Sequence, residues 1–148
     1  MVNNTMENQQ PTHFSKLDHN VFVPWKQEYS LDIPILDEQH RAVFTIINSL
    51  YYGMQNKYTG NILVPIIGMV TEYTSIHFQL EEHLLTTYGF PNVAKHKEYH
   101  RDLMAKLSSL GKQSLTDKDP YPMMDFLKKY WINHICKCDK EFGVYLIQ

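Results

Sequence analysis

Several features that mark common classes of protein are scarce in this sequence. It has only 2 cysteines among its 148 residues, Cys136 and Cys138, which lie too close together for an ordinary stapling disulfide and indicate a reducing compartment. Its formal charge of -2 shows no basic excess for nucleic acid. No apolar run approaches the roughly 18 residues of a membrane span, and the polar segment 1–10 lacks the apolar core of a secretory signal. We therefore expect a cytoplasmic protein with no membrane span and no nucleic-acid partner.

The apolar content that is present suits one soluble domain. Hydrophobic residues make up 43% of the chain, which is enough for a single core at this length. Residues 1–20 are polar and aperiodic, so we expect a flexible N-terminal tail there. Residues 21–148 are then expected to form the domain.

An arm rich in apolar and aromatic residues is expected at the start of the domain. Residues 21–36 are interrupted by Pro24 and Pro34, which favours an extended segment over a helix. Trp25 and Tyr29 are the side chains that we expect to anchor this arm on the domain.

Apolar residues then recur at intervals of three and four, which predicts four amphipathic helices. The first expected helix covers about 37–57 with Asp37 as its N-cap, and the second begins near residue 61 with Pro65 in its first turn. The third covers 93–110 with Gly111 as its C-cap, and the fourth begins at Asp119-Pro120. A polar loop is expected over 112–118, and a short amphipathic piece over 139–148. Because the connections are short, the predicted fold is all-α, an up-down-up-down antiparallel four-helix bundle with an N-terminal extended arm.

Two pairs of side chains within the predicted helices have the spacing of metal ligands. His77 and Glu81 are four residues apart, and so are His96 and His100. An α-helix turns about 100° per residue, so each pair lies on one face and directs two ligands at one point. Imidazole and carboxylate together suit a first-row metal.

More generally, the predicted inner faces carry an unusual set of polar side chains. The set consists of His40, His77, Glu81, His96, His100 and His134. Burying an isolated imidazole or carboxylate is costly, so the set needs a common partner, which a metal centre supplies. Taken singly, each has a plainer explanation, such as a satisfied core histidine or an ordinary pair across one helical turn. His13, His19 and His83 fall outside the pattern and are expected in solvent.

The stretches around these ligands resemble the hemerythrin family. They are Asp37-Glu38-Gln39-His40, His77-Phe78-Gln79-Leu80-Glu81-Glu82-His83, His96-Lys97-Glu98-Tyr99-His100 and His134-Ile135-Cys136-Lys137-Cys138-Asp139, with Pro24-Trp25 and Gly89-Phe90-Pro91 also similar. The resemblance covers about residues 22–142 and is of the single-domain bacterial kind. It implies a non-haem di-iron centre with an oxo or hydroxo bridge.

The resemblance also implies which residue binds which iron. His96, His100 and His134 would bind one iron, His40 and His77 the other, and Glu81 and Asp139 would bridge both. Spacing alone does not select Asp139, because five residues rotate a regular helix by about 500° and place it off the His134 face. We therefore expect the last helix to end or distort between His134 and Asp139.

The unequal division of histidines between the two irons implies a function. On this resemblance, the first iron would have six ligands, counting three histidines, two carboxylate oxygens and the bridge, whereas the second would have five and an open position. The resemblance implies reversible dioxygen binding there, for carriage, storage or delivery, with oxygen held end-on as hydroperoxide and no enzymatic activity. Both electrons would come from the irons and the proton from the bridge, so the net charge of the buried site would not change. Azide and nitric oxide are expected as alternative ligands.

An apolar lining would protect such a site from water and protons. Phe78, Leu80, Trp131 and Ile135 are the expected lining residues, although each fits an ordinary bundle core equally well. The family usually has a leucine-like residue where this sequence has Trp131, which would narrow the ligand pocket or its entrance.

Other functions remain open at this point. The same site could serve an oxygen or redox sensor, a di-iron peroxidase, an oxidase or a nitric-oxide-handling enzyme, or an iron or zinc store. A ferritin-like oxidase fits less well, since those sites are rich in glutamate with Glu-x-x-His spacing.

Overall fold

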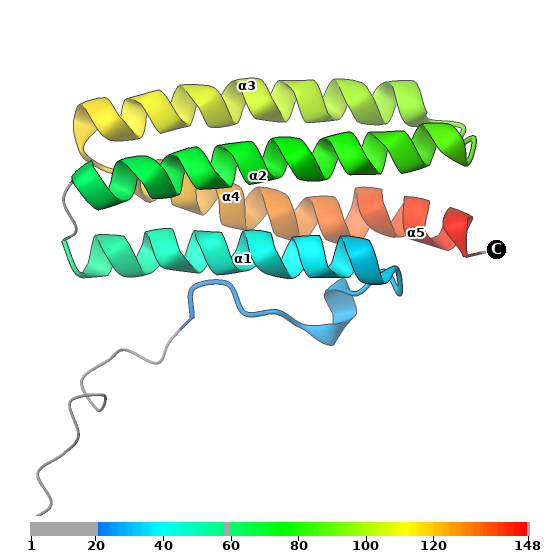
Figure 1. Cartoon of the computed structure of the whole chain (residues 1–148), viewed down its shortest axis with the longest axis horizontal. Helices are drawn as coiled ribbons and strands as arrows, with labels where there is room; N and C mark the ends of the chain where they lie inside the picture. The colour runs from blue at the N-terminus through cyan, green and yellow to red at the C-terminus, as the bar shows by residue number, and fades with distance from the viewer. Residues whose placement is uncertain (1–20, 58–59, 148) are drawn as a thin grey trace, which may run out of the picture.

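A computed structural model describes residues 21–57 and 60–147, and these form an antiparallel bundle of long helices (Figure 1). In chain order the elements are η2 (Gln27–Tyr29), α1 (Pro34–Gln55), α2 (Gly60–Thr87), α3 (Val93–Asp117), α4 (Tyr121–Asn133), η3 (His134–Asp139) and α5 (Lys140–Leu146). The last three follow one another without a break and form the fourth rod of the bundle. The predicted up-down-up-down four-helix bundle is thus confirmed. The predicted tail over residues 1–20 lies outside the described residues.

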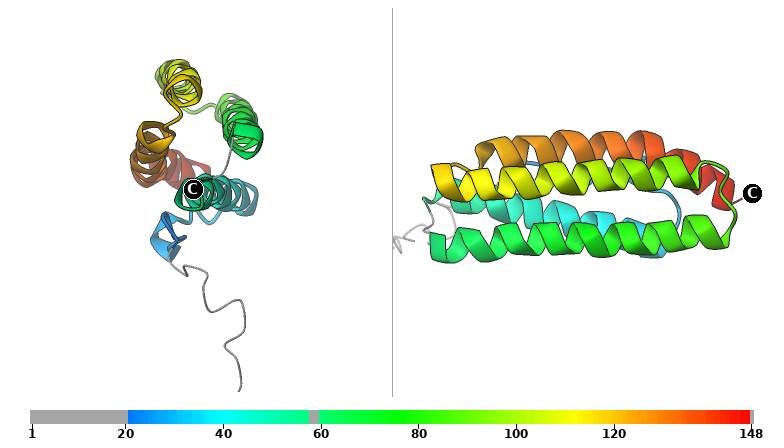
Figure 2. Two further views of the ribbon diagram at one scale, coloured as in Figure 1. Left: turned by 90° about the vertical axis from the view of Figure 1, so that its left-hand side faces the viewer. Right: turned by 90° about the horizontal axis from the view of Figure 1, so that it is seen from above.

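The four rods form a closed ring around one interior, as the end-on view in Figure 2 shows. The helix α1 packs against α2 and α4, and α3 packs against the same two neighbours. Each rod therefore turns one face inward, and residues that share this face meet at the axis. In the described part of the chain, no helix is both long enough and apolar enough to cross a bilayer.

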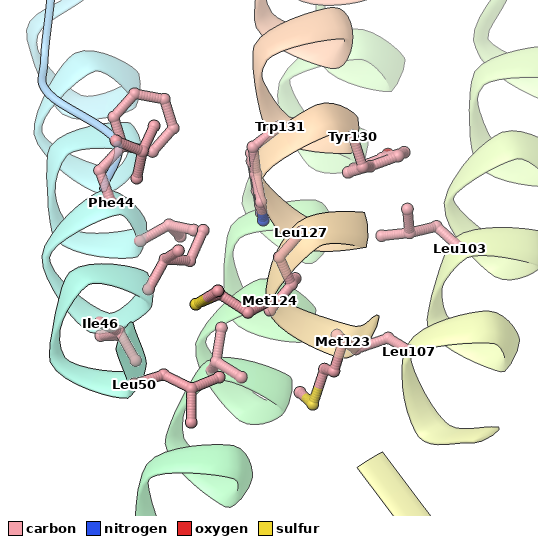
Figure 3. Close-up of a cluster of buried hydrophobic side chains, with 14 of the residues drawn as sticks. Phe44, Ile46, Leu50, Leu103, Leu107, Met123, Met124, Leu127, Tyr130 and Trp131 are labelled. Atoms are coloured by element: carbon pink, nitrogen blue, oxygen red, sulfur yellow. The ribbon is translucent and has the colours of Figure 1, made fainter. Parts of the chain in front are cut away.

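Two apolar clusters occupy different levels of this interior. The larger one includes Leu50, Leu107, Met123 and Leu127 and is shown in part in Figure 3. The smaller one, at the other end, consists of Leu31, Leu36, Leu85, Phe90 and Phe142. On every rod, the polar residues of the predicted inner-face set lie in sequence between members of the two clusters. Apolar packing therefore encloses this layer of polar side chains, called the polar level below, from both ends.

The N-terminal arm runs along the outside of the bundle before α1 (Figure 1). The predicted anchors are confirmed: the ring centroids of Trp25 and Tyr29 lie 5.9 and 5.7 Å from that of Phe44. The helix α1 begins at Pro34, so the predicted start at Asp37 is wrong. Proline at the first helical position has no N–H to leave unpaired. Asp37 instead accepts hydrogen bonds from the Leu31 N–H and the Ser30 hydroxyl, at 2.8 and 2.6 Å, and ties the arm to the helix.

Two further helix boundaries differ from the prediction. Pro65 lies inside α2, six residues into the helix rather than in its first turn, with its ring exposed. The helix α3 continues through Gly111 and the predicted loop over 112–118, and ends at Asp117 before Lys118 in the left-handed region at φ 55°. Gly111 acts in packing instead, because a Cβ there would lie 3.4 Å from Ile67 Cγ2 of the adjacent α2. The predicted short C-terminal piece forms α5.

Candidate metal centre

The carboxylate of Glu81 lies at the centre of the polar level. It projects from α2 and is fully buried. Its Oε1 lies 3.2 Å from Nε2 of His96, and its Oε2 lies 3.3 Å from Nε2 of His100, both on α3. Nε2 of His134 on the fourth rod and Nε2 of His77, one turn earlier on α2 itself, approach the same Oε2 at 3.5 and 3.6 Å. One carboxylate thus faces four imidazoles from three rods.

The carboxylate of Asp139 faces the remaining histidine. Its Oδ1 lies 2.9 Å from Nε2 of His134, and its Oδ2 lies 3.2 Å from Nε2 of His40 on α1. The imidazole of His40 in turn places Nε2 3.3 Å from Nε2 of His77. The two oxygens of Asp139 therefore point to histidines on different sides of the cluster. All seven residues predicted as ligands are brought together at one level of the bundle.

A π-helical turn places Asp139 there. The segment η3 spans His134–Asp139, and the N–H of Lys140 donates to the carbonyl of Ile135, five residues earlier. In π geometry, residues five apart lie one above the other, as residues four apart do in an α-helix. The expected distortion of the last helix is therefore present, and it brings His134 and Asp139 onto the same face.

The donor set fits a cation. Two ligands that each lie about 2.1 Å from a metal, at right angles to one another, are roughly 3.0 Å apart, close to the separations observed here. Buried side-chain atoms without a well-oriented hydrogen-bond partner include both oxygens of Glu81 and of Asp139, and Nε2 of His96, His100 and His134. Buried carboxylates without partners are strongly disfavoured, and a metal ion would satisfy all of these atoms together.

Two overlapping groups of these donors are each compact enough to hold an ion. One contains Glu81, His96, His100 and His134, and the other contains His77, Glu81, His134 and Asp139, with the ligand atoms in each within 4.8 Å of one another. Glu81 belongs to both groups. His134 does too, because its Nε2 lies between the two carboxylates.

The ionisation of the cluster supports the same conclusion. Burial lowers the pKa of His77 to about 3, so its imidazole is neutral at ordinary pH and keeps a lone pair for a metal. Burial alone would raise the pKa of Glu81, but His100, His134 and His96 outweigh it and hold this pKa well below its usual range. Burial alone would lower the pKa of His134, but the charge of Asp139 raises it well above the usual value. A positive charge is thus favoured beside Asp139.

Two outer contacts that the sequence did not predict orient the histidines. The Nδ1–H of His77 donates to Oε1 of Gln39, and the Nδ1–H of His100 donates to Oε1 of Glu82, both at 2.9 Å. Each bond fixes the tautomer that directs the Nε2 lone pair inward. The sequence indicates these contacts only weakly: Gln39 directly precedes His40, and Glu82 directly follows Glu81.

Aromatic rings surround the cluster. The ring centroid of Trp131 lies 5.1 Å from that of His77 and 6.0 Å from that of His40. Phe78 stacks on His100 at 3.7 Å with the ring planes 5° apart. Ile135 is fully buried as well. Leu80, by contrast, is half-buried and packs on the smaller apolar cluster, away from the other three predicted lining residues.

The residues set aside by the sequence lie elsewhere. His83 is exposed, as expected, and His13 and His19 lie outside the described residues. Cys136 is exposed and Cys138 is partly exposed, and both are free thiols.

The fold and the site together define a four-helix-bundle protein that binds cations. Residues 31–146 match the family described as the hemerythrin HHE cation binding domain, so the chain belongs to the hemerythrin family.

Individual relatives agree with this assignment. A bacteriohemerythrin of Clostridium acetobutylicum is 31% identical over 124 residues, which cover 80% of this chain and 96% of that protein. A hemerythrin-like protein of Naegleria gruberi is 26% identical over 118 residues, covering 80% of this chain and 88% of that protein. Among solved structures, two hemerythrin mutants superpose with TM-scores of 0.74 and 0.75, each at 25% identity over 86% of this chain and 98% of the other.

Proposed function

We propose that this protein binds dioxygen reversibly at a di-iron centre, for carriage, storage or delivery, and without enzymatic turnover. Membership of the hemerythrin family supports iron and dioxygen as metal and ligand. The observation that carries the proposal is the convergence of five imidazole Nε2 atoms on two carboxylates within a buried level of the bundle.

The arrangement of the carboxylates supports two irons rather than one. In the proposed assignment, His96, His100 and His134 bind one iron and His40 and His77 the other. Asp139 directs one oxygen at His134 and the other at His40, so its two oxygens serve histidines of different irons. Glu81 also approaches histidines of both irons: Oε1 lies 3.2 Å from His96, and Oε2 lies 3.3 Å from His100 and 3.6 Å from His77. Both carboxylates are therefore proposed as bridges.

The unequal division of histidines provides the ligand site. Three histidines would complete the shell of one iron, whereas two would leave an open position on the His40/His77 side. When bound, the irons supply the electrons for dioxygen, which we propose to be held end-on as hydroperoxide. The residues of this chain exclude water: Trp131 lies against both His40 and His77, and Phe78 and Ile135 close the same level. Azide and nitric oxide are proposed as alternative ligands at the same position.

Reversibility separates this function from an oxidase, a peroxidase or a redox sensor. The purified protein would be loaded with ferrous iron, reduced without air, exposed to air and then degassed while its visible spectrum is followed. The proposal expects an absorption band that appears with oxygen and disappears on its removal over repeated cycles. One-way conversion to the ferric spectrum in the first cycle would contradict reversible binding and favour turnover or sensing.

A further inference from the structure

A cavity of about 320 Å³ opens beside His96, one of the histidines of the metal centre. It lies between α3 and the rod formed by α4, η3 and α5. Its lining residues are Phe90, Asn92, Lys95, His96, Tyr99, Asn133, Cys138 and Glu141. Neither His40 nor His77 lines it, so it is separate from the open position proposed above.

The cavity reaches the metal centre through His96. Of the five clustered histidines, His96 has the largest exposed fraction, 7%, whereas the others are at most 2% exposed. Its Nε2 lies 3.2 Å from Glu81, and the residue also lines the cavity. A molecule in this cavity would therefore contact a side chain that itself faces the metals.

A second wall of the cavity is also coupled to the centre. Tyr99 lines the cavity, and its ring stacks on that of His134 at 5.8 Å with the planes 24° apart. The ring of Tyr130 stacks on both, at 5.2 Å from that of His134 and 5.6 Å from that of Tyr99. His96 and His134 belong to the same proposed iron. Electron transfer falls off steeply with distance, and a donor in this cavity would lie against His96, a proposed ligand of that iron, and against Tyr99, whose ring stacks on a second proposed ligand.

We propose that this cavity is the docking site of a small planar electron donor, of the reduced flavin class, which returns the oxidised centre to the ferrous state. The inference rests on the di-iron function proposed above. A dihydroflavin would give one electron to each of two ferric ions and release two protons, leaving oxidised flavin and two ferrous ions. Reduction would thus enter beside the saturated iron and leave the oxygen side closed to the donor.

The chemistry of the cavity matches that donor. Its volume lies at the lower end of the range for small-molecule sites. Phe90 and Tyr99 provide aromatic walls for a planar ring. Asn92 and Asn133 offer amide groups that can bond to ring carbonyl and N–H groups, and Glu141 offers an acceptor for a ring N–H. The exposed ammonium of Lys95 is placed to pair with a flavin phosphate.

The test compares two charge reversals on the same helix. Lys95→Glu changes the cavity, and Lys106→Glu makes the same change at an exposed site on α3 outside it. Binding of oxidised flavin mononucleotide to the metal-free protein would be measured by calorimetry. The rate at which the reduced flavin reduces the ferric protein would be measured by stopped flow. We expect Lys95→Glu to weaken binding and slow reduction about tenfold, equivalent to about 1.4 kcal/mol, and Lys106→Glu to leave both within about twofold.

A second pair of variants tests shape rather than charge. Asn92→Trp fills the cavity at an exposed position that makes no capping hydrogen bond, and Ser108→Trp places the same ring in the groove between α2 and α3. Only Asn92→Trp is expected to abolish flavin binding. The inference would be overturned if the wild-type protein did not bind flavin. It would also be overturned if the cavity variant and its control lost flavin binding equally in either pair. Flavin binding that follows this pattern in a protein without reversible oxygenation would refute the proposed function alone.

Discussion

Glu81 is the residue with the most contacts to the histidines of the centre. Its carboxylate is fully buried, and four imidazoles approach it within 3.6 Å. Without a metal, its negative charge is held in place only by these rings. With two metals, it would supply one oxygen to each shell. Burial of this charge therefore lowers the stability of the metal-free protein, whereas in the iron-loaded protein the carboxylate would bridge the two ions.

Replacing Glu81 by glutamine keeps the size of the side chain and removes the charge. We expect the iron content of the reconstituted protein to fall from two to one or fewer per chain, because an amide bridges two cations poorly. Iron would be measured by elemental analysis after gel filtration. The matched control is Glu72→Gln, an exposed glutamate on the same helix, which should keep both irons. Two irons in the Glu81 variant would refute the bridging assignment.

Trp131 is the residue that distinguishes the proposed ligand pocket of this chain. The side chain is fully buried and lies against both His40 and His77. Trp131→Leu would open space beside these histidines, so we expect faster azide binding to the ferric protein and faster autoxidation. The cavity left behind should also lower stability by roughly 2–4 kcal/mol.

The control for that prediction is Trp25→Leu, which changes the other tryptophan, on the arm and away from the centre. It should cost stability and leave azide kinetics unchanged. Unchanged azide and autoxidation rates in Trp131→Leu would show that this ring does not limit access.

At the scale of the element, the π turn of η3 decides whether Asp139 reaches the centre. A regular α-helix from Tyr121 to Leu146 would direct His134 and Asp139 to different faces. The π turn accommodates one extra residue and so places His134 and Asp139 on the same inner face. The helix α5 then continues the rod and packs Phe142 into the smaller apolar cluster.

Changing the length of η3 by one residue tests this role. Deleting the exposed Lys137 would leave the carboxylate four residues after His134, which is in phase on an α-helix. We therefore expect this deletion to retain two irons. Inserting one alanine after Lys137 should move Asp139 off the face and lose iron while the helical circular dichroism persists. Loss of iron in the deletion, or its retention in the insertion, would contradict the proposed role of the π turn.

The elements also show what the sequence could and could not predict. Six inner-face residues were found because α-helical spacing places them in phase with apolar neighbours, as for His77 and Glu81. Asp139 needed the family resemblance, because local spacing does not reveal a π turn. Gly111 was misinterpreted as a cap because its role depends on Ile67 of another helix. Gln39 and Glu82 were missed because a bond to the outer nitrogen of a histidine requires the packed bundle.

At the scale of the whole molecule, the polar level lies between two apolar clusters, so the centre and the fold are coupled. Removing the metal would leave two carboxylates buried and poorly satisfied. A ligand at about 1,000 times its dissociation constant stabilises a protein by about 4 kcal/mol, which corresponds to roughly 8–16 °C at this size.

We therefore expect the chelated protein to melt at least about 8 °C below the iron-loaded protein. Thermal denaturation followed by circular dichroism would measure the difference. Adding iron back should restore the higher melting temperature, and adding magnesium, which prefers oxygen ligands, should not. Equal melting temperatures with and without iron would show that the bundle does not depend on its metals.

We expect the seven clustered residues to hold two irons that together bind one dioxygen and release it. Oxygen uptake by the anaerobically reduced protein, measured with an electrode and referred to its iron content, tests this most directly. The account predicts one dioxygen for every two irons and every chain, recovered in full when the solution is degassed. A single metal per chain, or oxygen that is consumed and not returned, would contradict it.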